Sequence, residues 1–380
     1  MNRDLRIVHI MSGDLWAGAE TQSYTLIARL CRMPATVVGA VVLNQGALSA
    51  KLQALGVDVE ILDEAHMDAR RIVLRLKRFF QVWQPDVIHT HRDKENILGA
   101  IANGLTRRVP LVRTVHGGEE HLSEGWRAVR RRVVLGADRL VQRLSGQTIV
   151  AVSSDLATTL AKRNPKGRVV VIENGVDVDA LRAQGGLPRN ARVNSELTRI
   201  GIVGRLVPVK RVDLFLGMAR CLLDAEPSRV WKFEVFGDGP EREQLQALCN
   251  RLDIGSHVTF HGHRDDIARG MGGLDVLVMC SDHEGLPMAA LEAAVLGVPT
   301  VAHAVGGLVD VVPVELQVTR HEPQGYCDAA RRALRDDARE VAAKHAKRVL
   351  ERFSAERNAE RMRALYRDVL SRKAKGRVTG

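Results

Sequence analysis

The chain has 380 residues, of which 45% are hydrophobic and 27% charged, and its formal net charge is +11. This balance excludes a disordered tail protein, a collagen and a small disulfide scaffold, and at about 150 residues per domain the length predicts two domains, or three. Aromatic residues make up only 4%, which argues against a surface built on base stacking, whereas the positive charge favours phosphates, nucleic acid or an acidic membrane as partners.

Strand and helix patterns alternate along the first half of the chain. Short β-branched runs predict strands at 5–11, 36–43, 57–62, 87–90, 111–116, 148–152 and 169–172, and amphipathic stretches predict helices at 69–83 and 94–105. Such alternation is typical of a parallel sheet with helices on both faces.

The turn between the first strand and the helix that starts near Ala19 contains Gly18. A glycine there lets a ligand approach the backbone, and a helix N-terminus favours an anion. The alternative is an ordinary tight turn in which Glu20 complements the helix dipole. No Gly-Lys-Ser/Thr follows, so this is not a Walker loop.

The predicted helix at 124–144 combines arginines with apolar residues at helical spacing. A basic amphipathic helix with an aromatic residue can lie on an anionic membrane, and on this interpretation the basic segment 70–78 extends that surface. The alternative is a packed helix with a solvated arginine face. The residues concerned are Arg127, Arg130, Arg131, Arg132, Arg139 and Arg143, with Trp126, Val129, Val133, Leu140, Val141 and Leu144.

A polar stretch at 177–198 is the best linker candidate, and the alternation then restarts. Strands are predicted at 199–203, 232–236, 257–261, 276–280 and 300–303, and helices at 212–223, 241–252 and 288–296. The chain looks helical from 324 to about 372 and ends in a frayed basic tail at 373–380. We expect an α/β protein with doubly wound domains at 1–185 and 186–355, followed by a helix and tail at 356–380, with a cleft between the carboxyl ends of two facing sheets.

Two motifs of the second half point to a phosphate and a sugar. Arg205 and Lys210 follow the first strand there, and an arginine fork plus a lysine can neutralise a diphosphate without a metal. Further on, Pro287 fits the first position of a helix, Glu284 lies at its mouth and Glu292 about 7 Å inside at 1.5 Å per residue. A helix mouth binds phosphate, and two carboxylates can accept hydrogen bonds from sugar hydroxyls. The alternatives are solvated cations, a cap-region acid and a solvated glutamate.

The segment 281–292 resembles the E-x7-E signature of retaining glycosyltransferases with the GT-B fold, in particular the large family 4. The resemblance covers nearly the whole chain, because further family landmarks follow in the family's order at 86–91, 114–117, 151–153, 174–177, 204–210, 236–240, 258–262 and 306–307. The chain departs from the family where it has Ala17-Gly18 for Gly-Gly, His116-Gly117 for His-Asp, and Asp310 for Glu.

The resemblance implies that the C-terminal helix returns to the N-terminal domain. It also implies a role for each matching position. Glu292 would hold the ribose hydroxyls of a sugar nucleotide, and Glu284 would bind the transferred sugar. Arg205 and Lys210 would bind the diphosphate, while Gly18 would approach the donor and His116 the reacting carbon. The remaining donor-binding positions would be His263 and Arg264 beside the base, and the backbone near Gly285, Leu286, Pro287 and Met288; His91, Arg92 and Lys94 open a loop that would face the acceptor.

We expect no metal and no cofactor. Asp177-Val178-Asp179 has the form of the DxD magnesium ligand of a different glycosyltransferase fold, but it lies in the predicted linker. His89 and His91, like His261 and His263, share a face of a strand without a carboxylate or cysteine partner, which makes a poor zinc site. His89 is better explained as a core residue.

The cysteines and the apolar runs indicate the cellular compartment of the protein. The five cysteines are widely spaced and form no Cys-x-x-Cys pair, which indicates a reducing cytoplasm. No apolar run approaches the roughly 20 residues of a membrane-spanning helix, and the first ten residues do not resemble a signal peptide. We expect a cytoplasmic protein, with peripheral contact to the inner face of the cytoplasmic membrane left open.

The sequence therefore predicts a metal-independent, retaining hexosyltransferase that uses a nucleotide sugar. Its acceptor would be a glycan, lipid-linked, in the biosynthesis of cell-surface polysaccharide or lipopolysaccharide. Two alternatives remain: a sugar-nucleotide epimerase of the same fold, and a non-catalytic basic protein that binds nucleic acid. The sequence leaves the donor base and sugar, the linkage and the oligomeric state open.

Overall fold

The computed structural model describes residues 3–13, 18–116, 126–165, 167–185, 197–264, 266–285 and 288–378, with the backbone alone at 126–132 and 376–378. The chain divides into two compact units. The first contains Met1–Gly175 and Ala355–Gly380, and the second contains Val176–Ser354. Each unit is described by itself.

The first unit is built on a seven-stranded sheet with the order β3-β2-β1-β4-β5-β6-β7, in which every neighbouring pair is parallel. The strand order reverses between β1 and β4, as in a doubly wound domain. The strands are β1 (Leu5–Ser12), β2 (Thr36–Leu43), β3 (Asp58–Ile61), β4 (Val87–Thr90), β5 (Leu111–Val115), β6 (Thr148–Ala151) and β7 (Arg168–Val171). Helices α1 (Gly18–Leu30), α2 (Ala47–Ala54), α3 (Ala69–Trp83), α4 (Asp93–Gly104), α5 (Trp126–Ser145) and α6 (Ser154–Arg163) connect them.

Helix α3 shows how the sequence pattern fixes an element. Its buried residues Ile72, Leu76, Phe80 and Trp83 recur at the spacing of one helical face. The Asp68 side chain caps the start of the helix by accepting a hydrogen bond from the backbone N–H three residues on, over 2.8 Å. The predicted helix at 69–83 is therefore confirmed at both ends.

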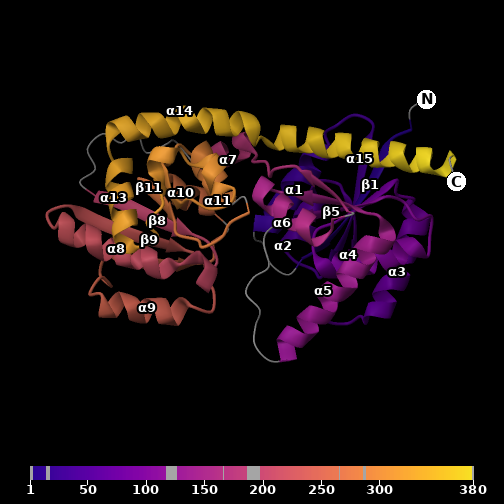
Figure 1. The fold of residues 1–380 in the computed structure, drawn as a ribbon, viewed down its shortest axis with the longest axis horizontal. Coiled ribbons are helices and arrows are strands. Elements are labelled where there is room, and N and C mark those ends of the chain that lie inside the picture. Colours follow the sequence, from indigo (N-terminus) through magenta and orange to yellow (C-terminus); the bar gives the residue numbers. More distant parts are fainter. Residues whose placement is uncertain are drawn as a thin grey trace. The chain divides into compact units, whose positions relative to one another are not determined.

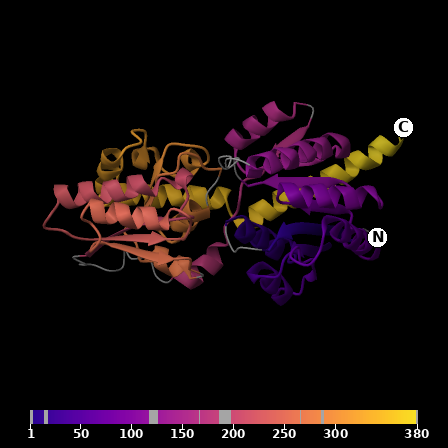
Figure 2. The same cartoon turned by 90° about the horizontal axis from the view of Figure 1, so that it is seen from below.

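The last helix, α15 (Ala355–Val378), belongs to the first unit. Met362, Leu365 and Tyr366 are buried in the same cluster as Ile27 and Leu30 of α1. Figures 1 and 2 show this yellow helix lying along the indigo and purple elements of that unit. The predicted return of the C-terminal helix is confirmed. The expected frayed tail is corrected, because residues 373–378 continue the helix.

The second unit contains a six-stranded parallel sheet with the order β10-β9-β8-β11-β12-β13. Its strands are β8 (Leu197–Val203), β9 (Val230–Phe236), β10 (Val258–Gly262), β11 (Val276–Met279), β12 (Thr300–His303) and β13 (Gln317–Val318). Its helices are α7 (Val178–Gly185), α8 (Val212–Ala225), α9 (Arg242–Arg251), α10 (Ile267–Gly272), α11 (Met288–Val295), α12 (Leu308–Val311), α13 (Pro323–Ala333) and α14 (Asp336–Arg352).

The structure differs from the prediction at the predicted linker. Residues 178–185 form α7, which starts where the Asp177 side chain accepts a hydrogen bond from the N–H of Ala180 over 3.1 Å. The helix packs on the second unit, where Gly185 lies against Leu296. The first unit consequently ends at Gly175 rather than at 185, and Asp177 caps a helix. The remainder of that stretch, 186–196, lies outside the described residues.

Candidate active site

The loop after β8 carries the two cations predicted to bind a diphosphate. Gly204 adopts a φ of +155°, and its N–H donates to the carbonyl of Phe236 over 3.0 Å. A Cβ atom on Gly237 would lie 1.9 Å from the oxygen of Gly204, so these two loops approach as closely as glycine allows. The chain then exposes Arg205 and places Lys210 at the end of a short 3-10 turn.

Lys210 and Glu284 form an ion pair at the carboxyl edge of the second sheet. The same carboxylate accepts a hydrogen bond from the Ser281 hydroxyl over 2.7 Å, and only 10% of the Glu284 side chain is exposed. The backbone N–H of Asp282 donates to the carbonyl of Val209 over 2.9 Å, which joins the loops after β8 and β11 a second time. The structure thus brings together a predicted phosphate ligand and a predicted sugar ligand that lie 74 residues apart in the chain.

The glycine pair after β12, Gly306 and Gly307, packs against the backbone of the loop that carries Glu284. Gly306 adopts a φ of +51°, and a Cβ atom there would lie 1.8 Å from the backbone oxygen of Glu284. The N–H of Gly307 donates to the carbonyl of Gly285 over 2.8 Å. Only glycine fits at position 306, which gives this predicted family landmark a physical reason.

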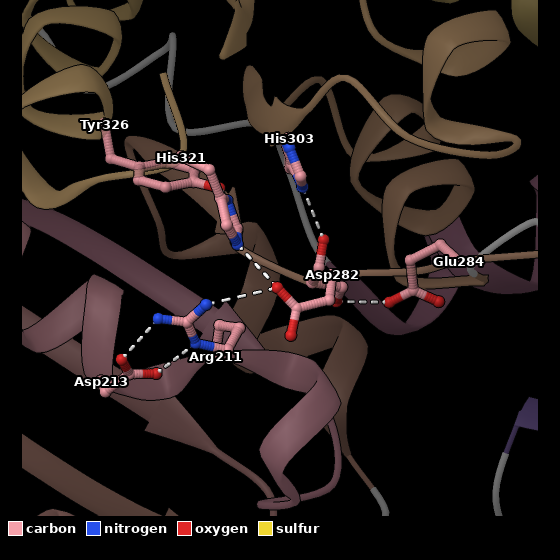
Figure 3. Close-up of polar contacts among 8 residues, drawn as sticks. Arg211, Asp213, Asp282, Glu284, His303, His321 and Tyr326 are labelled. Carbon is pink, nitrogen blue, oxygen red and sulfur yellow. Dashed lines mark hydrogen bonds and ion pairs between the residues drawn. The ribbon is translucent and has the colours of Figure 1, made fainter. Parts of the chain in front are cut away.

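A network of charged and aromatic side chains surrounds the loop after β11 (Figure 3). Asp282 accepts hydrogen bonds from Arg211 over 3.3 Å and from Nε2 of His321 over 2.8 Å. His303 stacks on His321 with 3.8 Å between ring centroids, and its Nδ1 donates to the carbonyl of Ser281 over 3.0 Å. Sequence reasoning missed this network, because its members come from separate segments and form no motif.

Glu292 lies on α11, and its side chain is partly buried. Burial raises the pKa of its carboxyl to about 7. The carboxyl therefore changes charge close to neutral pH, which matters for a group predicted to bind ribose hydroxyls. Leu286 and Pro287, which were also predicted to face the donor, lie outside the described residues.

The loop after β10 presents His263 and Arg264, the residues predicted to flank the base. Both side chains are exposed. Arg264 is held by Asp266 through two hydrogen bonds of 2.8 and 2.7 Å. Its neighbour His261 instead contacts Glu234, which also accepts a hydrogen bond from Arg199 over 2.6 Å.

The first unit gathers its own predicted site residues at the carboxyl edge of its sheet. Helix α1 begins at Gly18, one residue before the predicted start. His91 follows β4 and His116 follows β5, and Nδ1 of His91 lies 3.1 Å from Nε2 of His116. Because β4 and β5 are adjacent parallel strands, residues 25 positions apart become neighbours.

The two cations predicted to face the acceptor are both paired with carboxylates. Arg92 forms an ion pair with the buried Glu20 of α1. Lys94 forms one with Glu64 over 2.5 Å. An anionic acceptor group would therefore have to compete with these carboxylates, a feature that the sequence pattern did not show.

Among the described residues, three buried histidines come nearest to a metal site, with one ring nitrogen of each lying within 4.8 Å of the others. They are His9, His89 and His91. Both nitrogens of His89 are already engaged, Nδ1 with the Tyr366 hydroxyl at 2.7 Å and Nε2 with Thr114 at 2.8 Å. The rings of His89 and His91 stack at 4.4 Å and 27°, so their in-plane lone pairs do not converge on one point. The geometry favours a hydrogen-bonded cluster.

Helices α3, α4 and α5 pack side by side (Figure 1). Large apolar side chains that face solvent are Leu74, Val82, Ile101, Leu105, Val133, Leu140 and Leu144. The exposed arginines Arg70, Arg71, Arg78, Arg139 and Arg143 lie on the same helices. The predicted membrane-facing side chains of residues 126–132 lie outside the described side chains. In the parts of the chain that are described, no helix is both long and apolar enough to cross a bilayer.

Known proteins match both halves of the chain. Residues 16–180 match Glycosyltransferase Family 4, and residues 198–336 match Glycosyl transferases group 1. A 2-deoxystreptamine N-acetyl-D-glucosaminyltransferase from Streptomyces fradiae is 30% identical over 336 residues, which cover 85% of this chain and 74% of the relative. A D-inositol 3-phosphate glycosyltransferase from Corynebacterium jeikeium is 28% identical over 317 residues, which cover 75% of this chain and 72% of the relative.

Solved structures share the fold. Anabaena HepE in complex with UDP and glucose has a TM-score of 0.76 at 20% identity, covering 95% of this chain and 99% of the other. The apo form of the lipopolysaccharide outer core galactosyltransferase WaaB has a TM-score of 0.67 at 16% identity, covering 96% of this chain and 100% of the other.

Two parallel, doubly wound sheets and these likenesses define a glycosyltransferase of the GT-B fold. The chain belongs to the glycosyl transferases of group 1, as the resemblance predicted.

Proposed function

We propose that this glycosyltransferase moves a hexose-like unit from a nucleoside-diphosphate sugar to a glycan, with retention of anomeric configuration and without a metal. The observation that carries the proposal is the Lys210–Glu284–Ser281 cluster at the carboxyl edge of the second sheet. This cluster contains a cation for phosphate, Lys210, and a carboxylate for sugar hydroxyls, Glu284, and the two side chains touch each other. The UDP complexes of Anabaena HepE, which shares the fold, support a nucleotide sugar as the donor.

The chemistry breaks the bond between the anomeric carbon and the diphosphate. Negative charge then grows on the leaving group, where Arg205 and Lys210 would stabilise it. The acceptor oxygen attacks on the face that the diphosphate leaves, and its proton passes to the departing phosphate oxygen. Glu284 orients the sugar by accepting hydrogen bonds from its hydroxyls, and Glu292 holds the ribose. For His116 we keep the role that the family resemblance implies.

A lipid-linked acceptor is supported by the surface of α3, α4 and α5. Exposed leucines and valines beside arginines suit an anionic membrane face, where an acceptor of surface polysaccharide or lipopolysaccharide synthesis would be presented. On this proposal the protein is peripheral to the inner face of the membrane.

A second acceptor class rests on the names of the relatives. The Streptomyces fradiae and Corynebacterium jeikeium enzymes are named for 2-deoxystreptamine and D-inositol 3-phosphate, which are both cyclitols. A small cyclitol would need no membrane. Transfer to a panel of cyclitols and lipid-linked glycans separates the two acceptor classes.

Donor binding tests the core of the proposal. A thermal-shift screen of UDP-, GDP- and dTDP-sugars should show one that stabilises the protein by about 2.7 kcal/mol at a hundredfold excess over its Kd. No shift with any nucleotide sugar would reject the donor assignment. Incubation with the stabilising donor alone serves as the control, because an epimerase converts it without an acceptor. Salt-dependent binding to duplex DNA or RNA would point to the nucleic-acid alternative.

A further inference from the structure

Three histidines of the first unit form a continuous chain of hydrogen bonds, here termed the histidine chain: His9, His91 and His116. Nδ1 of His9 lies 3.1 Å from Nε2 of His91, and Nδ1 of His91 lies 3.1 Å from Nε2 of His116. The side chains of His9 and His91 are buried. The two outer nitrogens, Nε2 of His9 and Nδ1 of His116, are shielded from solvent and have no partner among the described residues.

Ser23 of α1 touches the middle of the histidine chain. Its hydroxyl donates to the carbonyl of Ala19 over 2.8 Å, which commits its one proton. At its second contact, 3.2 Å from Nδ1 of His91, the Ser23 oxygen can therefore only accept. Nδ1 of His91 must then carry the proton.

The remaining protons follow in sequence, because a neutral imidazole has one N–H and one acceptor nitrogen. Nε2 of His91 accepts, so Nδ1 of His9 is the donor of that pair. Nδ1–H of His91 is shared between Ser23 and Nε2 of His116, so Nε2 of His116 accepts. His116 is left with its proton on Nδ1, the outer nitrogen.

We propose that Ser23 sets the tautomers of the histidine chain, so that His116 is held neutral, with its proton on Nδ1 and its bare Nε2 bound to His91. Ser23 and His91 are then positioning residues for His116. Nδ1 of His116 is shielded from solvent, so the histidine chain fixes the orientation and proton position of this ring, and the effect on turnover rests on the proposed function. The assignment deepens that function by excluding His116 as a base, because its only bare nitrogen is already engaged with His91.

The charge state of the cluster agrees with this assignment. Burial lowers the pKa of His9 to about 3 and that of His116 to about 4, and it lowers the pKa of His91 well below the usual value. The neighbouring Arg92 adds to the lowering at His91 and His116. All three rings are therefore neutral at pH 7, as the single-proton argument requires.

Nitrogen NMR of the full chain labelled with ¹⁵N-histidine tests the assignment without substrate. A His116→Gln variant identifies the His116 signals. At pH 7.5 we expect His116 protonated at Nδ1 and bare at Nε2. Ser23→Ala should populate both His116 tautomers, because no other hydrogen bond then fixes which nitrogen of each ring carries the proton. Ser23→Thr keeps the hydroxyl and should retain the wild-type tautomer.

Tyr366→Phe is the matched control. It removes a buried hydroxyl that contacts His89, beside the histidine chain but outside it. This variant should leave the His116 tautomer and the kinetics unchanged. Ser23→Ala should lower kcat/KM about two- to tenfold, the worth of one neutral hydrogen bond, and Ser23→Thr should restore it.

Two results would overturn the proposal: a wild-type His116 protonated at Nε2, or a Ser23→Ala variant whose His116 tautomer is unchanged. A wild-type Nδ1–H tautomer combined with no binding of any nucleotide sugar would instead reject the proposed function, while the role of Ser23 in setting the tautomers would stand. The two failures are thus distinguishable.

Discussion

The Glu284 carboxylate is held by Lys210 and by the Ser281 hydroxyl, and its contacts lie at the edge of the sheet rather than in the core. Glu284→Gln should lower kcat by about 10- to 100-fold, because hydrogen bonds to a charged group contribute about 1.5–3 kcal/mol. Steady-state kinetics with the cognate donor measure this. Glu340→Gln, which breaks a surface ion pair with Lys344, is the control and should leave kcat unchanged. Wild-type turnover in Glu284→Gln would show that the site assignment is wrong.

Glu292 makes a prediction about pH. Burial raises its pKa to about 7, above the value of 4.5 for an unperturbed carboxyl. Between pH 4.5 and about 7 the folded state therefore holds a proton that the unfolded state has released. Compared with its effect below pH 4.5, this group lowers the free energy of unfolding progressively as pH rises, and the loss is complete above pH 7. Glu292→Gln should remove the loss and raise the free energy of unfolding at pH 8 by up to about 3 kcal/mol, with little change at pH 4. Urea titrations at the two pH values measure it, and equal effects at both would contradict the raised pKa.

The same carboxyl should make donor binding depend on pH. If its charged form accepts from the ribose hydroxyls, donor affinity of the wild type should weaken as pH falls from 8 to 6, since protonation removes the better acceptor. Calorimetric titration across this range tests it, with Glu292→Gln as the control that should bind weakly and without this dependence. A pH-independent wild-type affinity would remove Glu292 from the ribose site.

At the scale of elements, the turn after β12 depends on glycine. Gly306→Ala forces a Cβ to within 1.8 Å of the Glu284 oxygen at a φ of +51°. We expect a loss of about 1–3 kcal/mol in stability and a larger loss of activity, because the displaced backbone carries Glu284. Gly136→Ala in α5 has open space around its Cβ and should stabilise the protein by about 0.5–1 kcal/mol. Thermal unfolding of both variants checks the contrast, and a neutral Gly306→Ala would contradict the packing.

Helix α5 is the element on which the membrane proposal depends. Replacing Arg127, Arg130, Arg131 and Arg132 with Ser should reduce binding to anionic vesicles and spare turnover on a soluble acceptor, at about 1 kcal/mol per basic residue. The effect should shrink with added salt, since exposed charges are screened over about 8 Å at physiological ionic strength. Vesicle sedimentation at two salt concentrations measures it. A wild type that never sediments with anionic lipid would leave these arginines as a solvated face.

Elements with strong periodicity were predictable from sequence, and those fixed by distant contacts were not. Helix α3 follows from the spacing of Ile72, Leu76, Phe80 and Trp83 alone. Helix α7 falls in the predicted linker, because the polar residues around it, with Gly185-Gly186 and Pro188, conceal its packing within the second unit. The run at 324–372 divides into three helices without a glycine or proline at either break, so the strongest helix-breaking residues are absent there.

At the scale of the whole molecule, the motifs named candidate residues in both units, but the contacts among those residues come only from the fold. The sequence predicted Glu284 and Lys210 separately, whereas their ion pair requires β8 and β11 to be adjacent. Likewise Tyr366 reaches His89 across 277 residues because α15 returns to the first unit. Buried networks join residues by three-dimensional proximity, which spacing along the chain does not encode.

The proposed metal independence is tested on the whole enzyme. Arg205 and Lys210 place two cationic side chains at the predicted diphosphate position, where Lys210 is also paired with Glu284. On our proposal these two cations take the place of a divalent metal ion. Activity should therefore survive EDTA. Loss of turnover on chelation, restored by magnesium or manganese, would contradict this part of the mechanism.

The central claim is retaining transfer from a nucleotide sugar, and the anomeric configuration of the product tests it most directly. The purified protein is incubated in EDTA with the donor that stabilises it and with the acceptor panel, and the product is analysed by proton NMR before it can re-equilibrate. We predict a glycoside with the configuration of the donor, formed only when an acceptor is present. An inverted glycoside, or an altered donor sugar in the absence of acceptor, would contradict it.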